Sequence, residues 1–129
     1  MTAVRFQQRR ENFQRSFALL QRAVAKEQLS ELERGGLIQF FEVSFELGWK
    51  CLGDHLESEG YTLVSPKQIL RQAFQSGLIE DGELWLQALE DRNLTTHTYD
   101  EQKSKEIEGI IRTQYFTLLE KLTDTLARL

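Results

Sequence analysis

The most chemically versatile stretch of the sequence covers residues 92–99, Arg-Asn-Leu-Thr-Thr-His-Thr-Tyr. The guanidinium of Arg92 is always charged and can hold a phosphate through its forked donors. Histidine is the residue type that most readily accepts or donates a proton at neutral pH, so His97 could do so. Metal-free RNA cleavage needs both groups, because the ribose 2′-hydroxyl loses a proton as it attacks phosphorus and the phosphate charge must be stabilised. The two residue types therefore suit phosphodiester chemistry.

A purely structural interpretation fits the same residues. Arg92 would form an ion pair with Asp91 or Glu90, and His97 would lie at the negative end of a helix dipole. In a continuous helix, five residues turn the chain by about 140° past a full circle, so the two side chains would point apart. They converge only if the helix ends between them, as the weak helix formers there allow, or if a second subunit completes the site. Spacing alone favours the structural interpretation, since an arginine five residues before a histidine is common by chance.

No other constellation indicates a cofactor or a metal. Gly35-Gly36 lacks the flanking pattern of a phosphate-binding loop. The two histidines lie far apart, and Cys51 is the only cysteine, so neither a metal site nor an internal disulfide is expected. Glu42 and Glu46 lie one helical turn apart and could act as acid and base, but such pairs are far more often solvated or structurally paired. We therefore expect no cofactor.

Length and composition describe one globular domain covering residues 1–129. The chain has 40% hydrophobic and 28% charged residues with a single proline, which favours long helices around one core. The net charge of −4 and the pI of about 5.3 argue against a protein that coats nucleic acid by global charge. No apolar stretch reaches the length of a membrane helix, and the N-terminus has no signal-peptide core, so we expect a cytoplasmic protein.

The first element that positions these groups is an amphipathic helix expected over residues 4–26. Its apolar residues recur at helical spacing and form one stripe: Phe6, Phe13, Phe17, Leu20 and Val24. Its polar face is basic, with five arginines against the single acid of that stretch: Arg5, Arg9, Arg10, Arg15 and Arg22. We expect these arginines to form a basic groove, provided that a dimer brings them near residues 92–99.

A second helix is expected over residues 30–59. Ser30 and Glu33 have the spacing of a capping box, and Gly60 suits the left-handed stop. The helix carries two apolar stripes, of which one suits the core of the domain: Leu37, Phe41, Phe45, Trp49, Leu52 and Leu56. The other needs further helices of the same chain or a second copy: Phe40, Val43, Leu47 and Cys51. Burial within the monomer and a homodimer through this helix both remain open.

Three further helix starts complete the expected fold. Ser65 followed by Pro66 begins a short helix that stops at Gly77, and Asp81 is expected to cap a fourth helix. Asp100 is expected to cap one last helix with a long apolar stripe: Ile107, Ile111, Leu118, Leu122 and Leu126. No strand pattern competes. The expected fold is all-α, an up-and-down four-helix bundle with one extra short helix.

Two blocks of the sequence carry a family resemblance. Residues 37–50, LIQFFEVSFELGWK, and residues 90–99, EDRNLTTHTY, resemble the nucleotidyltransferase substrate-binding protein family. The members of this family are small helical bundles, grouped with the HepT toxins of the HEPN superfamily. Both blocks occur in order and at the right separation, and the resemblance extends from the basic first helix to the last amphipathic one.

The resemblance implies a homodimeric four-helix bundle with metal-independent endoribonuclease activity. The motif of the HepT toxins is arginine, four residues, histidine, one residue and tyrosine, and Arg92, His97 and Tyr99 fill it. Asn93 supplies the polar residue that usually follows the arginine. The resemblance places the active sites where the two motifs of the dimer meet, with RNA as the substrate.

The resemblance also implies a partner protein, a minimal nucleotidyltransferase that is usually encoded next door. This antitoxin would neutralise the toxin by transferring AMP to Tyr99, which would put bulk and negative charge beside Arg92 and His97. The older family name implies a different role, a non-catalytic subunit that presents a substrate or nucleotide to the nucleotidyltransferase. A third interpretation is a structural bundle in which the motif is a vestige.

Overall fold

The computed structural model describes residues 2–92 and 100–129, and every element within these ranges is helical. The expected all-α class is therefore confirmed. The helices, in chain order, are α1 Thr2–Ala25, α2 Glu31–Ser58, α3 Pro66–Gln75, α4 Gly82–Asp91, α5 Glu101–Ile110, the π-helical segment η2 Ile111–Tyr115, and α6 Phe116–Arg128.

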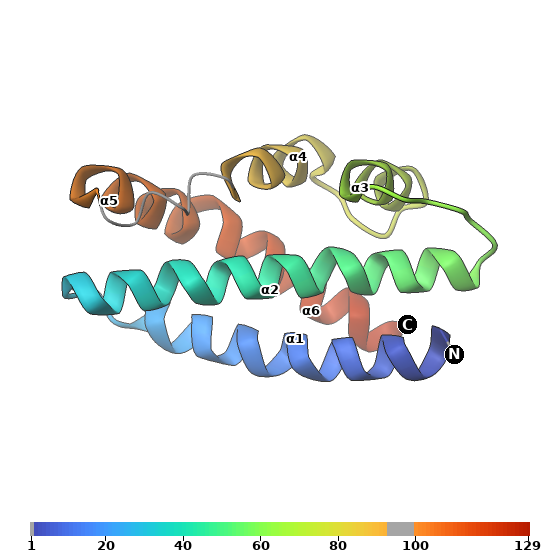
Figure 1. Cartoon of the computed structure of the whole chain (residues 1–129), viewed down its shortest axis with the longest axis horizontal. Helices are drawn as coiled ribbons and strands as arrows, with labels where there is room; N and C mark the ends of the chain where they lie inside the picture. The colour runs from blue at the N-terminus through green and yellow to red at the C-terminus, as the bar shows by residue number, and fades with distance from the viewer. Residues whose placement is uncertain (1, 93–99) are drawn as a thin grey trace.

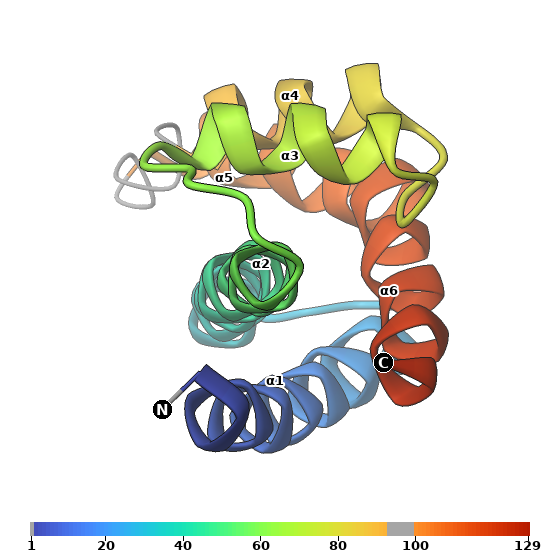
Figure 2. The same ribbon diagram turned by 90° about the vertical axis from the view of Figure 1, so that its right-hand side faces the viewer.

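The long helices α1 and α2 form an antiparallel hairpin (Figure 1). The shorter helices α3, α4 and α5 lie on the opposite side of α2 from α1 (Figure 2). From the end of α5 the chain descends through η2 into α6, which reaches the level of α1 at its C-terminus (Figure 2). Helix α2 is thus the central element, and it contacts α1, α3, α5 and α6.

Local capping signals fix most of the helix boundaries. The hydroxyl of Ser30 accepts from the Glu33 backbone N–H at 3.2 Å, and the Glu33 carboxylate accepts from the Ser30 N–H at 2.8 Å. Gly60 ends this helix with φ +98°, as expected for a left-handed stop. One expectation about the caps was wrong. Asp81 precedes α4 but makes no capping hydrogen bond, and its carboxylate lies 3.6 Å from the Lys121 ammonium instead.

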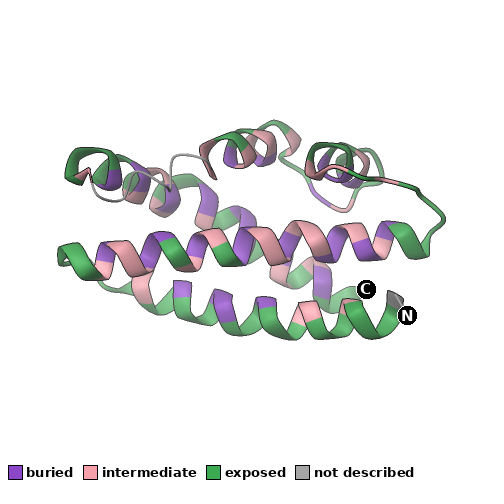
Figure 3. Cartoon of the chain, in the orientation of Figure 1, coloured by how far each residue is buried: buried purple, intermediate pink, exposed green. Residues whose placement is uncertain are grey.

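The first apolar stripe of α2 lies in the core, whereas the second is covered unevenly. Buried, half-buried and exposed residues alternate along this helix (Figure 3). In the first stripe only Trp49 is half-buried, and the others are at most 1% exposed. In the second stripe Cys51 is fully buried, Phe40 and Leu47 are half-buried, and Val43 is 36% exposed. The single chain therefore leaves part of this stripe open to solvent.

The last helix differs from the expectation, because it is interrupted. The sequence predicts one continuous helix after Asp100, but η2 inserts a π turn between α5 and α6, with the Phe116 N–H donating to the Ile111 carbonyl. A π turn holds one more residue than an α turn. The apolar residues on both sides still follow each other at threes and fours, so the sequence periodicity gives no sign of the interruption.

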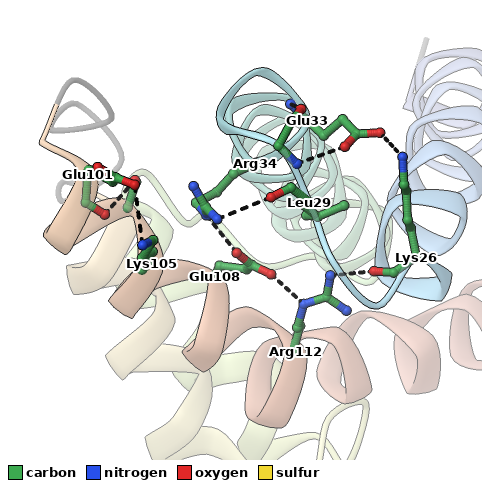
Figure 4. A network of polar contacts seen from close by, with 10 residues as sticks. Lys26, Leu29, Glu33, Arg34, Glu101, Lys105, Glu108 and Arg112 are labelled. Carbon is green, nitrogen blue, oxygen red and sulfur yellow. Dashed lines mark hydrogen bonds and ion pairs between the residues drawn. The ribbon is translucent and has the colours of Figure 1, made fainter.

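A partly buried ionic network holds the start of α2 against the C-terminal helices (Figure 4). The Glu108 carboxylate accepts from Arg34 and from Arg112, each at 2.7 Å. Arg112 also donates to the Val24 and Lys26 carbonyls at 2.8 and 2.7 Å, which satisfies free acceptors at the end of α1. Burial alone would raise the pKa of Glu108, but the hydrogen bonds from both arginines outweigh it and leave this pKa below its ordinary value.

Candidate active site at the end of helix α4

Arg92 is the C-cap residue of α4, and its backbone N–H donates to the Ala88 carbonyl. Helix α4 therefore ends at Asp91, immediately before Arg92. The Arg92 guanidinium donates to the Glu46 carboxylate of α2. The expected pairing of Arg92 with Asp91 or Glu90 was wrong, because the docking of α4 beside α2 brings Glu46 within reach.

The Arg92–Glu46 pair is only half-buried. The two side chains are 27% and 31% exposed, respectively. A guanidinium in this position is oriented by the carboxylate and remains open to solvent on part of its surface. It can therefore present donors to an incoming phosphate, in competition with Glu46.

Asp91, the residue before Arg92, is held from a different direction. The Tyr115 hydroxyl of η2 donates to the Asp91 carboxylate, and the Gln87 amide donates to the same hydroxyl oxygen at 3.1 Å. Burial, and next the hydrogen bond donated to Asp91, raise the pKa of Tyr115 well above its ordinary value. The hydroxyl therefore keeps its proton at neutral pH and acts as a donor.

Stacked aromatic rings hold α4 and η2 against α2. Tyr115 stacks on Phe41 of α2 with ring centroids 5.5 Å apart, and Trp85 of α4 stacks on Phe45 with centroids 5.6 Å apart. All four residues are at most 2% exposed. Such contacts fix ring positions as well as burying apolar area, so Trp85 fixes the first turn of α4 on α2 and the Phe41 ring fixes that of Tyr115.

The other predicted site residues, Asn93, His97 and Tyr99, lie outside the described residues. The structure fixes the two points between which they are joined. Arg92 closes the C-terminus of α4, and the Asp100 carboxylate caps α5 by accepting from the Lys103 backbone N–H at 3.1 Å. The cap at Asp100 is confirmed.

The arginines of α1 do not join this site within one chain. Arg5 and Arg9 donate to the same oxygen of Asp54 on α2, at 3.0 and 2.8 Å, and Asp54 is only 3% exposed. Helix α1 lies on the opposite side of α2 from α4 (Figures 1 and 2). A groove that combines these arginines with Arg92 would therefore require a second copy of the chain. The sequence predicts the groove under the same condition.

Within residues 2–92 and 100–129, no group of three or more His, Cys, Asp or Glu side chains is arranged to hold a metal ion. Over the same ranges, none of the helices combines the length and apolar character that a bilayer crossing requires. Cys51 is buried, and burial followed by the charge of Asp54 raises its thiol pKa to about 12, so this cysteine is not a nucleophile at neutral pH.

Comparison with known proteins decides the family. A family model described as "nucleotidyltransferase substrate binding protein like" matches residues 8–128. The chain belongs to this family. A relative with an assigned name is the "probable ribonuclease HepT" of Haemophilus influenzae, 36% identical over 74 residues. That match covers 54% of this chain and 51% of the relative, so the chain spans about half the length of the relative.

A solved structure resembles this member of the nucleotidyltransferase substrate-binding family over most of its length. The crystal structure of a protein from Thermus thermophilus superimposes with a TM-score of 0.80 at 36% sequence identity. The match covers 88% of this chain and 98% of the Thermus chain. The helical arrangement is therefore shared by both proteins.

Sequence reasoning identified Arg92 in this family member but missed the residues that hold it. Glu46 was recognised only as one of two acids on a helix face, although it lies in the first block of the family resemblance. Gln87 and Tyr115 gave no signal, because an isolated glutamine and a tyrosine on an apolar stripe are ordinary residues of a helical protein. Their role depends on how α4 and η2 pack.

Proposed function

We propose that this protein is a HepT-like toxin, a metal-independent endoribonuclease that cleaves RNA with Arg92 and His97. The observation that supports this best is the position of Arg92. Its guanidinium is oriented by Glu46 at the end of α4 and keeps part of its surface open to solvent. The family match and the HepT relative are consistent with this activity.

In the proposed reaction, His97 takes the proton from the ribose 2′-hydroxyl as O2′ forms a bond to phosphorus. The bond between phosphorus and the 5′-oxygen breaks, and the leaving oxygen takes up a proton, so that a 2′,3′-cyclic phosphate and a 5′-hydroxyl end result. Arg92 stabilises the charge on the phosphate oxygens. Asn93 supports the site as a polar neighbour, and no metal enters any step.

The functional unit that we propose is a homodimeric four-helix bundle in which the two motifs meet. The half-covered stripe of α2 supports this assembly, since Val43 is 36% exposed and Phe40 and Leu47 are half-buried in the single chain. A second copy packed on this stripe would bury it and would lie beside Glu46 of the same helix. Light scattering or sedimentation of the purified chain measures the assembly directly.

The proposed partner is a minimal nucleotidyltransferase that transfers AMP to Tyr99. The phenolic oxygen would bond to the α-phosphorus of ATP, with pyrophosphate leaving. The added phosphate would repel RNA from Arg92 and occupy its space. Intact mass spectrometry after co-expression with the neighbouring nucleotidyltransferase tests this: added AMP mass on wild type and none on Tyr99→Phe is expected. An unchanged mass of the wild type would contradict the modification.

The family description favours one alternative, a non-catalytic subunit that presents a substrate or nucleotide to the nucleotidyltransferase. This alternative predicts a stable complex, binding of ATP by calorimetry, and no cleavage of RNA by the unmodified chain. It places no demand on Arg92 as a catalytic group.

The experiment that separates the two functions is RNA cleavage in the presence of EDTA by protein expressed without its partner. We expect wild type to cleave, and Arg92→Ala and His97→Ala each to be inactive while remaining folded by circular dichroism. Undiminished cleavage by both variants would contradict the proposed site. Absence of cleavage by unmodified wild type would favour the binding subunit.

A further inference from the structure

The π-helical segment η2 places a buried tyrosine at its C-terminal end. Tyr115 is 2% exposed, and its ring is held against Phe41 of α2 in a stacked geometry with an interplanar angle of 16°. A single π turn within an α-helix is rare and is frequently found at functional sites. The ring of Tyr115 therefore has a fixed position, from which its hydroxyl reaches another helix.

That hydroxyl contacts two residues of the last turns of α4. It donates to the Asp91 carboxylate and accepts from the Gln87 amide at 3.1 Å. Gln87 and Asp91 are four residues apart and thus lie on one face of the helix. A hydrogen bond from a phenol to a carboxylate is charge-assisted and stronger than a neutral one. The contact joins η2 to the residue that immediately precedes Arg92.

We propose that Tyr115 is a positioning residue for the candidate active site. Through Asp91 it fixes the last turn of α4. It thereby sets the backbone position of Arg92 and the direction in which the Arg92 side chain extends. Glu46 holds the guanidinium from α2, while Tyr115 holds the end of α4 from η2, so the site has two independent anchors. This inference rests on the ribonuclease function proposed above.

The test is Tyr115→Phe, which removes the hydroxyl and keeps the stacked ring. Misplacement of a group by about 1 Å can cost about a hundredfold in rate, so we expect RNA cleavage in EDTA to fall by about tenfold to a hundredfold. Tyr61→Phe is the matched control, because Tyr61 is 40% exposed and lies just after the C-terminal end of α2. We expect no change in cleavage for this variant. Asp91→Asn keeps an acceptor for the hydroxyl and should lose less activity than Asp91→Ala.

Hydrogen–deuterium exchange separates positioning from a general loss of stability. We expect Tyr115→Phe to accelerate exchange of the amides in the last turn of α4, with exchange in α2 unchanged. Exchange accelerated throughout the protein, with normal cleavage per folded molecule, would show a merely structural role and overturn the proposal.

Failure of this inference differs from failure of the proposed function. If wild type and Tyr115→Phe cleave equally, the positioning role is wrong and the ribonuclease function stands. If wild type does not cleave, the ribonuclease function fails, and hydrogen exchange of Tyr115→Phe tests the anchoring of α4 by Tyr115. Faster exchange confined to the end of α4 supports this anchoring, and unchanged exchange there overturns it.

Discussion

The guanidinium of Arg92 at the end of α4 is paired with the carboxylate of Glu46 in the middle of α2. This ion pair joins the two sequence blocks that carry the family resemblance, residues 37–50 and 90–99. The first block therefore contributes more than core packing, since it supplies the residue that orients the arginine of the second block. An incoming phosphate would meet a guanidinium whose direction is already set, and would compete with Glu46 for its donors.

The Arg92–Glu46 pair should contribute little to stability. Because both side chains keep more than a quarter of their surface in contact with solvent, we expect a coupling energy of about 0.5–1 kcal/mol. A double-mutant cycle with Arg92→Ala and Glu46→Ala, read by urea unfolding, measures it. The same unfolding curves give the stability of Arg92→Ala itself, which shows whether this variant stays folded in the activity test. A coupling several times larger than about 1 kcal/mol would contradict the weak, partly exposed pair.

The network around Glu108 should, in contrast, support the fold. Glu108→Gln weakens the attraction to Arg34, which is buried, and to Arg112, which is partly buried, and we expect a loss of about 1–3 kcal/mol in the free energy of unfolding at pH 7. Lys105→Gln on the same helix is the control, because Lys105 is 54% exposed in its ion pair with Glu101 and should matter little.

The contribution of Glu108 should depend on pH in a defined direction. Its pKa in the folded protein lies below the ordinary value of 4.5, so its stabilising effect is complete above that value and disappears as the pH falls through the folded pKa. The stability difference between wild type and Glu108→Gln should therefore shrink on acidification below about pH 4. A difference that grows on acidification would contradict the assigned network.

Two glycines of α2 should respond oppositely to alanine. A Cβ at Gly48 would lie 2.7 Å from Leu122 and 3.4 Å from Phe13, both fully packed, so Gly48→Ala should destabilise by about 1–3 kcal/mol. A Cβ at Gly35 would meet no atom within 4 Å, so Gly35→Ala should stabilise the helix by about 0.5–1 kcal/mol. Thermal unfolding of both variants checks the pair. Equal shifts of the same sign would contradict the close approach of α1 and α6 to Gly48.

Local sequence signals predicted the helix caps, which depend on a few neighbouring residues. They did not predict side-chain partners that depend on how the helices pack. The caps at Ser30, Ser65 and Asp100 were predictable, because a side chain and a backbone N–H three residues apart settle each of them. The partner of Arg92 was not, because Glu46 is 46 positions away and is brought close only by the docking of α4 beside α2.

The π turn illustrates a second limit. It changes the number of residues per turn without changing the order of apolar and polar residues. The spacing of the apolar residues therefore does not predict it. Tyr115 then reads as one more core residue, and its hydrogen bond to Asp91 becomes visible only in three dimensions. The family resemblance supplied the expected roles of Asn93 and Tyr99, and it favours the proton-transfer role of His97 that residue type suggested and spacing did not support.

The proposed function requires the unmodified chain to cleave RNA by attack of the ribose 2′-hydroxyl, without a metal. The most direct measurement compares one single-stranded RNA with its all-2′-deoxy counterpart, in EDTA, for wild type, Arg92→Ala and His97→Ala. We predict that wild type cleaves only the RNA, leaving 2′,3′-cyclic phosphate ends, and that neither variant cleaves either strand. Cleavage of the deoxy strand, or equal cleavage of RNA by the variants, would contradict the claim.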